Sequence, residues 1–210
     1  MPRKPLTSLP LIFYNMSNRV DVGWIVGGRI VEEQAPDKQF QQQLVEAMGS
    51  VSEASPLALL QGYSEHSVDD KGRIIMPQRF RELFGRACVI TQGWDRSLFV
   101  FHPDTWQQIR AHLARYPFIN ENAVRLQRFF ISPADNVDID SQGRLAIPAH
   151  LREYASISLP TSESPSTVVI VGAPYRLEIW SKQRWKQVNE QVEDSTIFQA
   201  AAILGVTLEL

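Results

Sequence analysis

The chain has 210 residues, of which 44% are hydrophobic and 21% charged, a composition typical of an ordinary soluble globular protein of one or two domains. It contains no run of 18 apolar residues that could span a membrane, and its single cysteine, Cys88, excludes an internal disulfide, which fits a cytoplasmic protein. The net charge of −2 does not indicate a nucleic-acid partner, so any such prediction must rest on where the charges lie.

Residues 1–60 share no sequence pattern with the rest of the chain, and we expect them to form a poorly structured N-terminal extension. Arg3 and Lys4 lie near the start, but no continuous apolar segment with a small-residue cleavage site follows them. We therefore expect no secretory signal peptide.

An internal repeat organises the chain from residue 62 onwards. The segment VDDKGRIIMP at 68–77 returns as IDSQGRLAIP at 139–148, at an offset of 71 residues. A second block of glycine, aliphatic and aromatic positions returns at an offset of 79 residues, and the extra length falls in the Ser/Pro/Thr-rich stretch 158–167. Two blocks in the same order indicate two copies of one structural unit.

Each copy predicts the same elements in the same order. A first strand ends at a turn in which Gly72 or Gly143 can adopt a positive φ, and a second strand returns from it, so the pair is predicted to form a hairpin. Pro77 and Pro148 suit the first turn of a short helix, which is followed by two β-branched and aromatic strands and a last helix. The predicted ranges are 62–68, 73–76, 77–84, 87–92, 97–101 and a helix from 104 in the first copy, and 136–140, 144–147, 148–154, 167–171, 176–180 and a helix from 181 in the second.

The predicted fold class is mainly β with short helices, an α+β fold. A unit of roughly 45 residues buries too little apolar surface to be stable alone, so we expect the two copies to complete one core as a pseudo-dimer. The predicted organisation is an extension at 1–60, a first unit at 62–106, a connecting helical segment at 107–132, a second unit at 134–185 and a helical tail at 186–210.

Basic residues concentrate in one segment of the first copy. Residues 71–86 contain five basic residues and one acidic residue, Glu82, so the net charge of this segment is +4. The basic residues are Lys71, Arg73, Arg79, Arg81 and Arg86. Such a patch can contact phosphates, and an arginine can also donate two hydrogen bonds to a guanine edge in the major groove. The corresponding part of the second copy is less basic, so the first copy is the better candidate for a DNA-binding face.

An aspartate precedes each turn glycine by three residues and needs a different role, because carboxylates repel phosphate. Asp69 and Asp140 can accept backbone N–H groups of the turn and hold the arginine four residues on. Two readings of Arg73 and Arg144 therefore stay open: each contacts DNA directly, or each only pairs with its aspartate to fix the turn.

These motifs resemble those of the MraZ family over residues 62–185. The residues that carry the resemblance are Tyr63–Arg73, Pro77 with Phe80–Glu82, Gln127–Phe130, Asp140–Arg144, Pro148 with Leu151–Ala155, and Leu177–Trp180. A single Asp-x-x-x-Arg motif would be unspecific, but two at this spacing are fairly specific. This sequence departs from the family pattern in its long N-terminal extension, its loop insertion and its apolar C-terminal tail.

The resemblance implies two tandem SpoVT-AbrB (swapped-hairpin) units that form a pseudo-dimeric barrel and assemble into homo-oligomeric rings. It implies binding of double-stranded DNA at repeated promoter sites of the division and cell-wall gene cluster, commonly as a repressor, and association with the nucleoid. The predicted DNA-binding residues are Lys71, Arg73, Arg79, Arg81 and Arg144, and the predicted turn-structuring residues are Asp69, Gly72, Asp140 and Gly143.

Other kinds of site have little support. The four histidines lack the spacing of metal ligands, Cys88 lies in an apolar strand pattern typical of the core, and we find neither a Gly-rich phosphate loop nor a nucleophile–base signature. We therefore expect no enzyme activity, cofactor, metal or small-molecule substrate. The alternative function is an AbrB-like protein-interaction scaffold that binds a partner as an antitoxin does, with DNA binding secondary.

Overall fold

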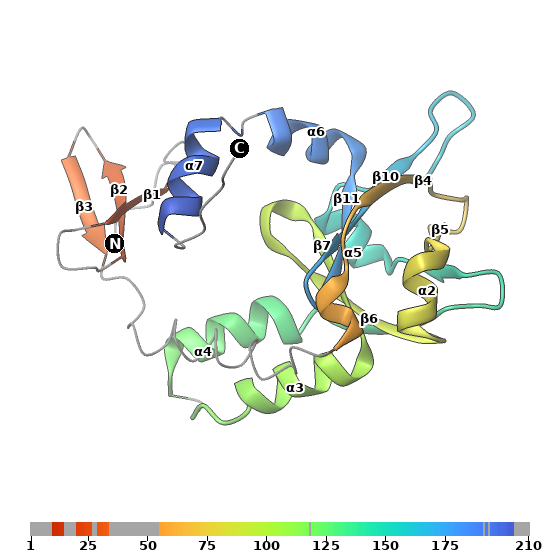
Figure 1. Ribbon diagram of the computed structural model, residues 1–210, viewed down its shortest axis with the longest axis horizontal. Helices are drawn as coiled ribbons and strands as arrows, with labels where there is room; N and C mark the ends of the chain where they lie inside the picture. Colours follow the sequence, from red (N-terminus) through yellow and green to blue (C-terminus); the bar gives the residue numbers. More distant parts are fainter. Residues whose placement is uncertain are drawn as a thin grey trace. The chain divides into compact units, whose positions relative to one another are not determined.

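The computed structural model describes residues 10–14, 20–26, 29–33, 55–117, 119–190, 192 and 194–203 (Figure 1). The chain divides into two compact units, residues 1–50 and residues 51–210. The first unit holds an antiparallel sheet of order β1-β2-β3, formed by Pro10–Tyr14, Val20–Val26 and Arg29–Glu33. Of the predicted N-terminal extension, residues 1–60, the structure describes only these strands and residues 55–60.

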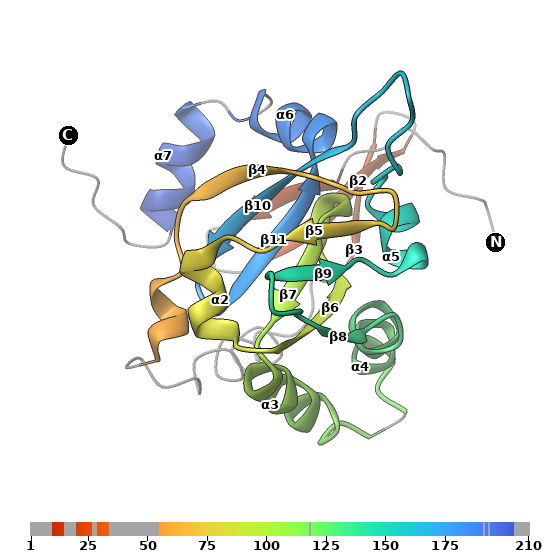
Figure 2. The same ribbon diagram turned by 90° about the vertical axis from the view of Figure 1, so that its right-hand side faces the viewer.

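The second unit is built on a six-stranded antiparallel sheet and a separate two-stranded ribbon (Figure 2). The sheet has the order β4-β10-β11-β7-β6-β8, with β4 at Tyr63–Ser67, β6 at Ala87–Gln92, β7 at Leu98–Phe101, β8 at Asp135–Asp138, β10 at Thr167–Ala173 and β11 at Arg176–Ser181. The ribbon consists of β5 (Arg73–Ile75) and β9 (Arg144–Ala146), which run antiparallel.

The two repeats exchange strands. The first strand of the first repeat, β4, pairs with β10 of the second, and the first strand of the second repeat, β8, pairs with β6 of the first. The ribbon also takes one strand from each repeat. The predicted hairpins within each copy are therefore wrong: the turns after β4 and β8 form, but the strands on either side of each turn join different sheets.

The mixture of antiparallel strands and short helices is confirmed, whereas a closed barrel is not found among the described residues. The six-stranded sheet ends at β4 on one side and at β8 on the other, and these two strands do not pair. The ribbon lies across one face of the sheet as a second layer (Figure 2).

Short helices follow the strands as the repeat predicts. Pro77 and Pro148 occupy the N-cap positions of α2 and α5, where the missing N–H of proline costs no hydrogen bond. The helices are α2 (Gln78–Phe84), α3 (Pro103–Leu113), α4 (Glu121–Leu126), which continues as the π-helical turn η3 (Gln127–Ile131), α5 (Ala149–Tyr154), α6 (Lys182–Glu190) and α7 (Asp194–Ile203), with short 3₁₀ turns at η1 (Pro56–Leu59) and η2 (Trp94–Arg96).

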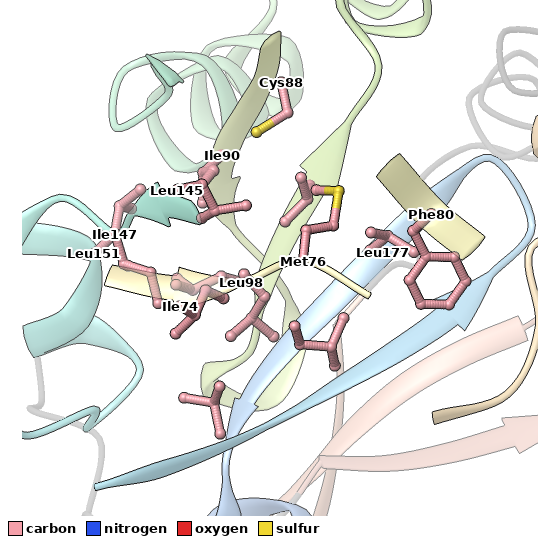
Figure 3. Packing of buried hydrophobic residues seen from close by; sticks show 14 of the residues in the cluster. Ile74, Met76, Phe80, Cys88, Ile90, Leu98, Leu145, Ile147, Leu151 and Leu177 are labelled. Carbon is pink, nitrogen blue, oxygen red and sulfur yellow. The ribbon is translucent and has the colours of Figure 1, made fainter. Parts of the chain in front are cut away.

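The main core lies between the ribbon and the sheet (Figure 3). Ile74 and Leu145, the middle residues of the two ribbon strands, point into it and are almost completely buried. They pack with alternate residues of the sheet, among them Ile90, Leu98 and Leu177. The ribbon therefore has one face fixed to the core, and its other face must point outwards because strand residues alternate.

A smaller aromatic cluster covers the opposite face of the sheet. Phe99 and Phe101 of β7 pack there with Trp106 of α3 and Phe130 of η3. The alternation along β7 thus sends one set of side chains to each core, which gives the sheet two buried faces over this strand.

Candidate nucleic-acid interface

The turn that leads into β5 is closed by hydrogen bonds to Asp69. Its Oδ1 atom accepts the backbone N–H groups of Lys71 at 2.9 Å and Arg73 at 2.8 Å. Its Oδ2 atom accepts from Nε and Nη2 of Arg73, both at 2.6 Å. The N–H of Gly72 donates to the carbonyl of Asp69 at 3.0 Å, and this tight turn gives Gly72 a φ of +72°. We name residues 69–73 turn A.

The turn that leads into β9 has the same geometry. Oδ1 of Asp140 accepts the N–H groups of Gln142 and Arg144, each at 2.9 Å, and Oδ2 accepts Nε of Arg144 at 2.7 Å. The N–H of Gly143 donates to the carbonyl of Asp140 at 2.8 Å, and φ of Gly143 is +79°. We name residues 140–144 turn B. Both turns therefore orient an arginine at the first residue of a ribbon strand.

The hydrogen bonds also favour the charged form of each aspartate. Burial raises the pKa of the Asp69 carboxyl, but the backbone and side chain of Arg73 and the N–H of Lys71 outweigh it and hold this pKa below its ordinary value. The backbone N–H and then the side chain of Arg144 lower the pKa of Asp140. Both ion pairs are thus formed at neutral pH.

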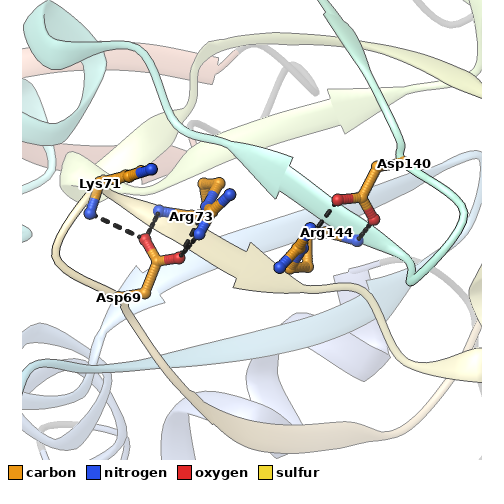
Figure 4. A network of polar contacts seen from close by, with 5 residues as sticks. All are labelled: Asp69, Lys71, Arg73, Asp140 and Arg144. Carbon is orange, nitrogen blue, oxygen red and sulfur yellow. Dashed lines mark hydrogen bonds and ion pairs between the residues drawn. The ribbon is translucent and has the colours of Figure 1, made fainter.

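The register of the ribbon brings the two arginines onto one exposed face. Arg73 lies opposite Ala146, and Arg144 lies opposite Ile75. Residues that face each other or alternate along a strand share one side, so these four side chains lie on the side away from the core. Figure 4 shows Arg73 and Arg144 between Asp69 and Asp140, over the ribbon. Turns A and B lie at opposite ends of the ribbon, because its strands are antiparallel.

Each turn glycine also receives an arginine from the other repeat. A Cβ atom on Gly72 would lie 2.7 Å from Nε of Arg152, and one on Gly143 would lie 2.6 Å from Nε of Arg81. Arg152 donates from Nε to the carbonyl of Ile147 at 3.1 Å, whereas Nε of Arg81 is buried without a hydrogen-bond partner among the described residues. Glycine is therefore needed in both turns for its positive φ and for this close approach.

The remaining predicted site residues do not all lie on the ribbon. Lys71 is exposed in turn A. Arg79 lies against Gly62 before β4, with its guanidinium 4.6 Å from the ring centre of Phe80. There, burial and then the charge of Arg79 lower the pKa of His66. The positive charges of residues 71–86 thus lie in several places: Arg73 on the ribbon face, Arg81 at the turn B end of the ribbon and Arg79 beside the start of β4.

Two residues near this face carried no predicted role. Arg152 lies against the glycine of turn A as Arg81 lies against the glycine of turn B. Because the two arginines are 71 residues apart, the repeat offset could have identified Arg152 as the counterpart of Arg81. Ile75 is 51% exposed on the ribbon face, at the end of β5 and opposite Arg144. The alternation of strand residues around buried Ile74 could have placed it there.

Other reactive groups lie elsewhere. Cys88 is buried on β6, and burial followed by the charge of Asp138 raises the pKa of its thiol to about 12, so it is a thiol at neutral pH. Among the described residues, no three His, Cys, Asp or Glu side chains lie close enough together to hold a metal ion. Within the same part of the chain, no helix is both long and apolar enough to cross a membrane.

The chain is similar to known proteins over the part that holds both turns. The family model for the MraZ protein, described as antitoxin-like, matches residues 59–129 and again residues 130–205. The transcriptional regulator MraZ of Heliobacterium modesticaldum is 42% identical over 137 residues, which is 65% of this chain and 91% of the relative. That of Caldanaerobacter subterraneus is 39% identical over the same shares of both chains, and that of Acetivibrio thermocellus is 36% identical over 147 residues, 69% of this chain and 98% of the relative. Because the family model matches both repeats, this chain belongs to the MraZ family of transcriptional regulators.

Proposed function

We propose that the chain regulates transcription by binding double-stranded DNA with the exposed face of the β5–β9 ribbon. The observation that carries this proposal is the presence of two arginines, one from each repeat, on one exposed face, each oriented by an aspartate. A two-stranded ribbon is narrow enough to enter the major groove, where base edges present distinct patterns of donors and acceptors.

The pairing of Arg73 with Asp69 supports direct contact with a base and does not compete with it. Asp69 takes hydrogen bonds from Nε and Nη2, which leaves Nη1 and the outer edge of the guanidinium without a partner among the described residues. That edge is the fork that donates to O6 and N7 of guanine. Because the aspartate already restricts the side chain, less conformational entropy is lost when it binds.

The charges of the ribbon predict modest binding by a single chain. Lys71, Arg73 and Arg144 are balanced by Asp69, Asp70 and Asp140, so phosphate contacts depend on the arginines brought to the ribbon ends, Arg81 and Arg152. We infer that useful affinity needs several copies on repeated sites, as a homo-oligomeric ring would provide. The exchange of strands between the repeats supports swapped-hairpin units within each copy.

The target is inferred from the family. Repeated promoter sites of the division and cell-wall gene cluster are the proposed operators, and binding there would place the protein at the nucleoid in the cytoplasm. Arg73 and Lys71 on turn A, and Arg144 on turn B, are the proposed contacts of the ribbon and its turns. Arg81 and Arg152 at the ribbon ends and Arg79 beside the start of β4 are proposed as further phosphate contacts.

Fluorescence anisotropy tests this function. The purified chain is titrated against a duplex from upstream of its own gene and against a scrambled duplex, over a salt series. We expect preference for the upstream duplex, a steep fall of affinity with salt, and loss of roughly 10-fold or more in Arg73→Ala, the cost of a bidentate base contact. Arg115→Ala is the matched control, because this exposed arginine follows α3, which packs on the other face of the sheet.

A second candidate function is a protein-interaction scaffold, favoured by the antitoxin-like description of the family model. In that case the upstream and scrambled duplexes bind equally and weakly, and Arg73→Ala changes both by the same small factor. This result would contradict sequence-specific binding through the ribbon.

A further inference from the structure

An exposed isoleucine lies beside both arginines on the proposed DNA-binding face, at the end of β5. Ile75 is a neighbour of both ribbon arginines, because Arg73 precedes it by two residues on the same face and Arg144 lies opposite it. Half of its side chain is exposed, although its neighbour Ile74 is almost completely buried in the core. An isolated exposed isoleucine is common on protein surfaces. This one is held on a rigid strand, and its β-branched side chain has few rotamers, so its position relative to the arginines is fixed.

The pseudo-symmetry of the ribbon makes Ile75 informative. The offset of 71 residues pairs Arg73 with Arg144 but pairs Ile75 with Ala146. The backbone of a DNA duplex has a similar twofold symmetry, so a ribbon with identical halves would bind a site equally well in either orientation. The two halves of this ribbon face differ because one carries the sec-butyl side chain of Ile75 where the other carries only the methyl group of Ala146.

We propose that Ile75 is a specificity-determining residue that contacts the 5-methyl group of a thymine in the major groove, and that it thereby fixes the orientation of the ribbon on its site. This inference rests on the proposed function. The methyl group of thymine is the apolar feature of the major groove, and an aliphatic side chain beside two guanine-reading arginines is suited to it. Ile75 and Arg73 are two residues apart, about 7 Å at roughly 3.4 Å per residue, which is close to two base steps of about 3.4 Å. The thymine is therefore expected within about two base pairs of the guanine that Arg73 contacts.

Removal of single methyl groups from the DNA tests this contact. In the upstream duplex used for anisotropy, each thymine is replaced in turn by deoxyuridine, which removes the methyl group and keeps every hydrogen bond. We expect the wild-type chain to lose about 4-fold in affinity at one thymine, the effect of withdrawing one buried carbon group from contact. Ile75→Ala should lose a similar factor on the unmodified duplex and become insensitive to uracil at that position.

Two further variants separate a methyl contact from a general loss of binding. Ile75→Ala combined with Ala146→Ile should recover sensitivity to uracil at the same thymine, because the pseudo-twofold of the ribbon lets it bind in the reversed orientation with the isoleucine at the same place. Ile119→Ala, which removes an isoleucine that is 75% exposed and not on the ribbon, should leave the uracil profile unchanged. Thermal unfolding confirms that each variant is folded.

The outcomes distinguish the two proposals. If the wild-type chain prefers the upstream duplex and Arg73→Ala abolishes this preference, but no uracil substitution distinguishes wild type from Ile75→Ala, the ribbon reads DNA and the role of Ile75 is wrong. If the wild-type chain does not distinguish the duplexes, both proposals are wrong.

Discussion

Turns A and B share one set of hydrogen bonds but present different side chains. In both, an aspartate accepts two backbone N–H groups and an arginine side chain, and a glycine takes a positive φ. Lys71 of turn A corresponds to Gln142 of turn B, and Asp70 corresponds to Ser141. The residues shared by the turns are those that the backbone geometry requires, whereas the residues that differ point to solvent. The duplicated scaffold thus fixes where a side chain is placed and leaves its chemistry free to change.

The two ends of the ribbon also differ in how well their buried groups are satisfied. Arg152, beside turn A, donates to the carbonyl of Ile147, while the equivalent Nε of Arg81, beside turn B, has no partner among the described residues. A buried donor without a partner costs free energy, so turn B carries a penalty that turn A does not.

The largest effect is expected from the glycines. Alanine at Gly143 or Gly72 would have to adopt a positive φ and would also place Cβ against Arg81 or Arg152. Alanine at Gly85, where φ is +68° and nothing lies within 4 Å of the added Cβ, isolates the backbone cost. Gly85 has ψ of −125°, a conformation that residues with a Cβ rarely adopt. We expect Gly85→Ala to lower the free energy of unfolding by about 1–3 kcal/mol, and both turn variants to lower it by clearly more in urea titrations. Equal losses at all three positions would show that the arginines do not approach the turns closely.

A smaller effect should separate turn A from turn B. Arg152→Met removes the hydrogen bond to the Ile147 carbonyl and should lower the free energy of unfolding by about 1 kcal/mol. Arg81→Met removes a buried donor that has no partner and keeps a side chain of similar length, so its effect on stability should be close to zero or favourable. The same urea titrations measure both. A loss at Arg81 as large as that at Arg152 would mean that its guanidinium makes an equivalent bond in solution.

The smallest effect concerns pH. The pKa values of Asp69 and Asp140 are lowered in the folded chain, so their contribution to stability is present above the unfolded pKa of about 3.9 and is lost as the pH falls through the folded values. Asp69→Asn and Asp140→Asn keep an acceptor for the backbone but lose the ion pair. We expect each to lower Tm at pH 7, by similar amounts for the two turns, and we expect the difference from the wild type to disappear as the pH falls through the folded pKa values. A gap that persists at low pH would assign the loss to packing.

The sequence predicted most element boundaries to within one or two residues, because strand and helix patterns are local. It predicted the two turns and their aspartate–arginine pairs for the same reason, since every partner lies within four residues. The choice of strand partners was missed: a strand, a tight turn and a strand normally form a hairpin, and nothing local to turn A shows that β4 pairs with β10. The role of Arg152 was missed because charge was counted along the chain, whereas Arg152 reaches turn A from the other repeat.

The exchange of strands has a consequence for how the protein is made. While a ribosome synthesises the first repeat, β4 has no partner, because β10 belongs to the end of the second repeat. The nascent chain therefore carries an unpaired strand until most of the second repeat has emerged. Pairing between strands so far apart in the sequence is slow. A polypeptide with a single repeat could complete such a sheet only by meeting a second molecule, at a rate set by concentration. Covalent fusion of the repeats removes that dependence, so that one newly made molecule can fold without waiting for another.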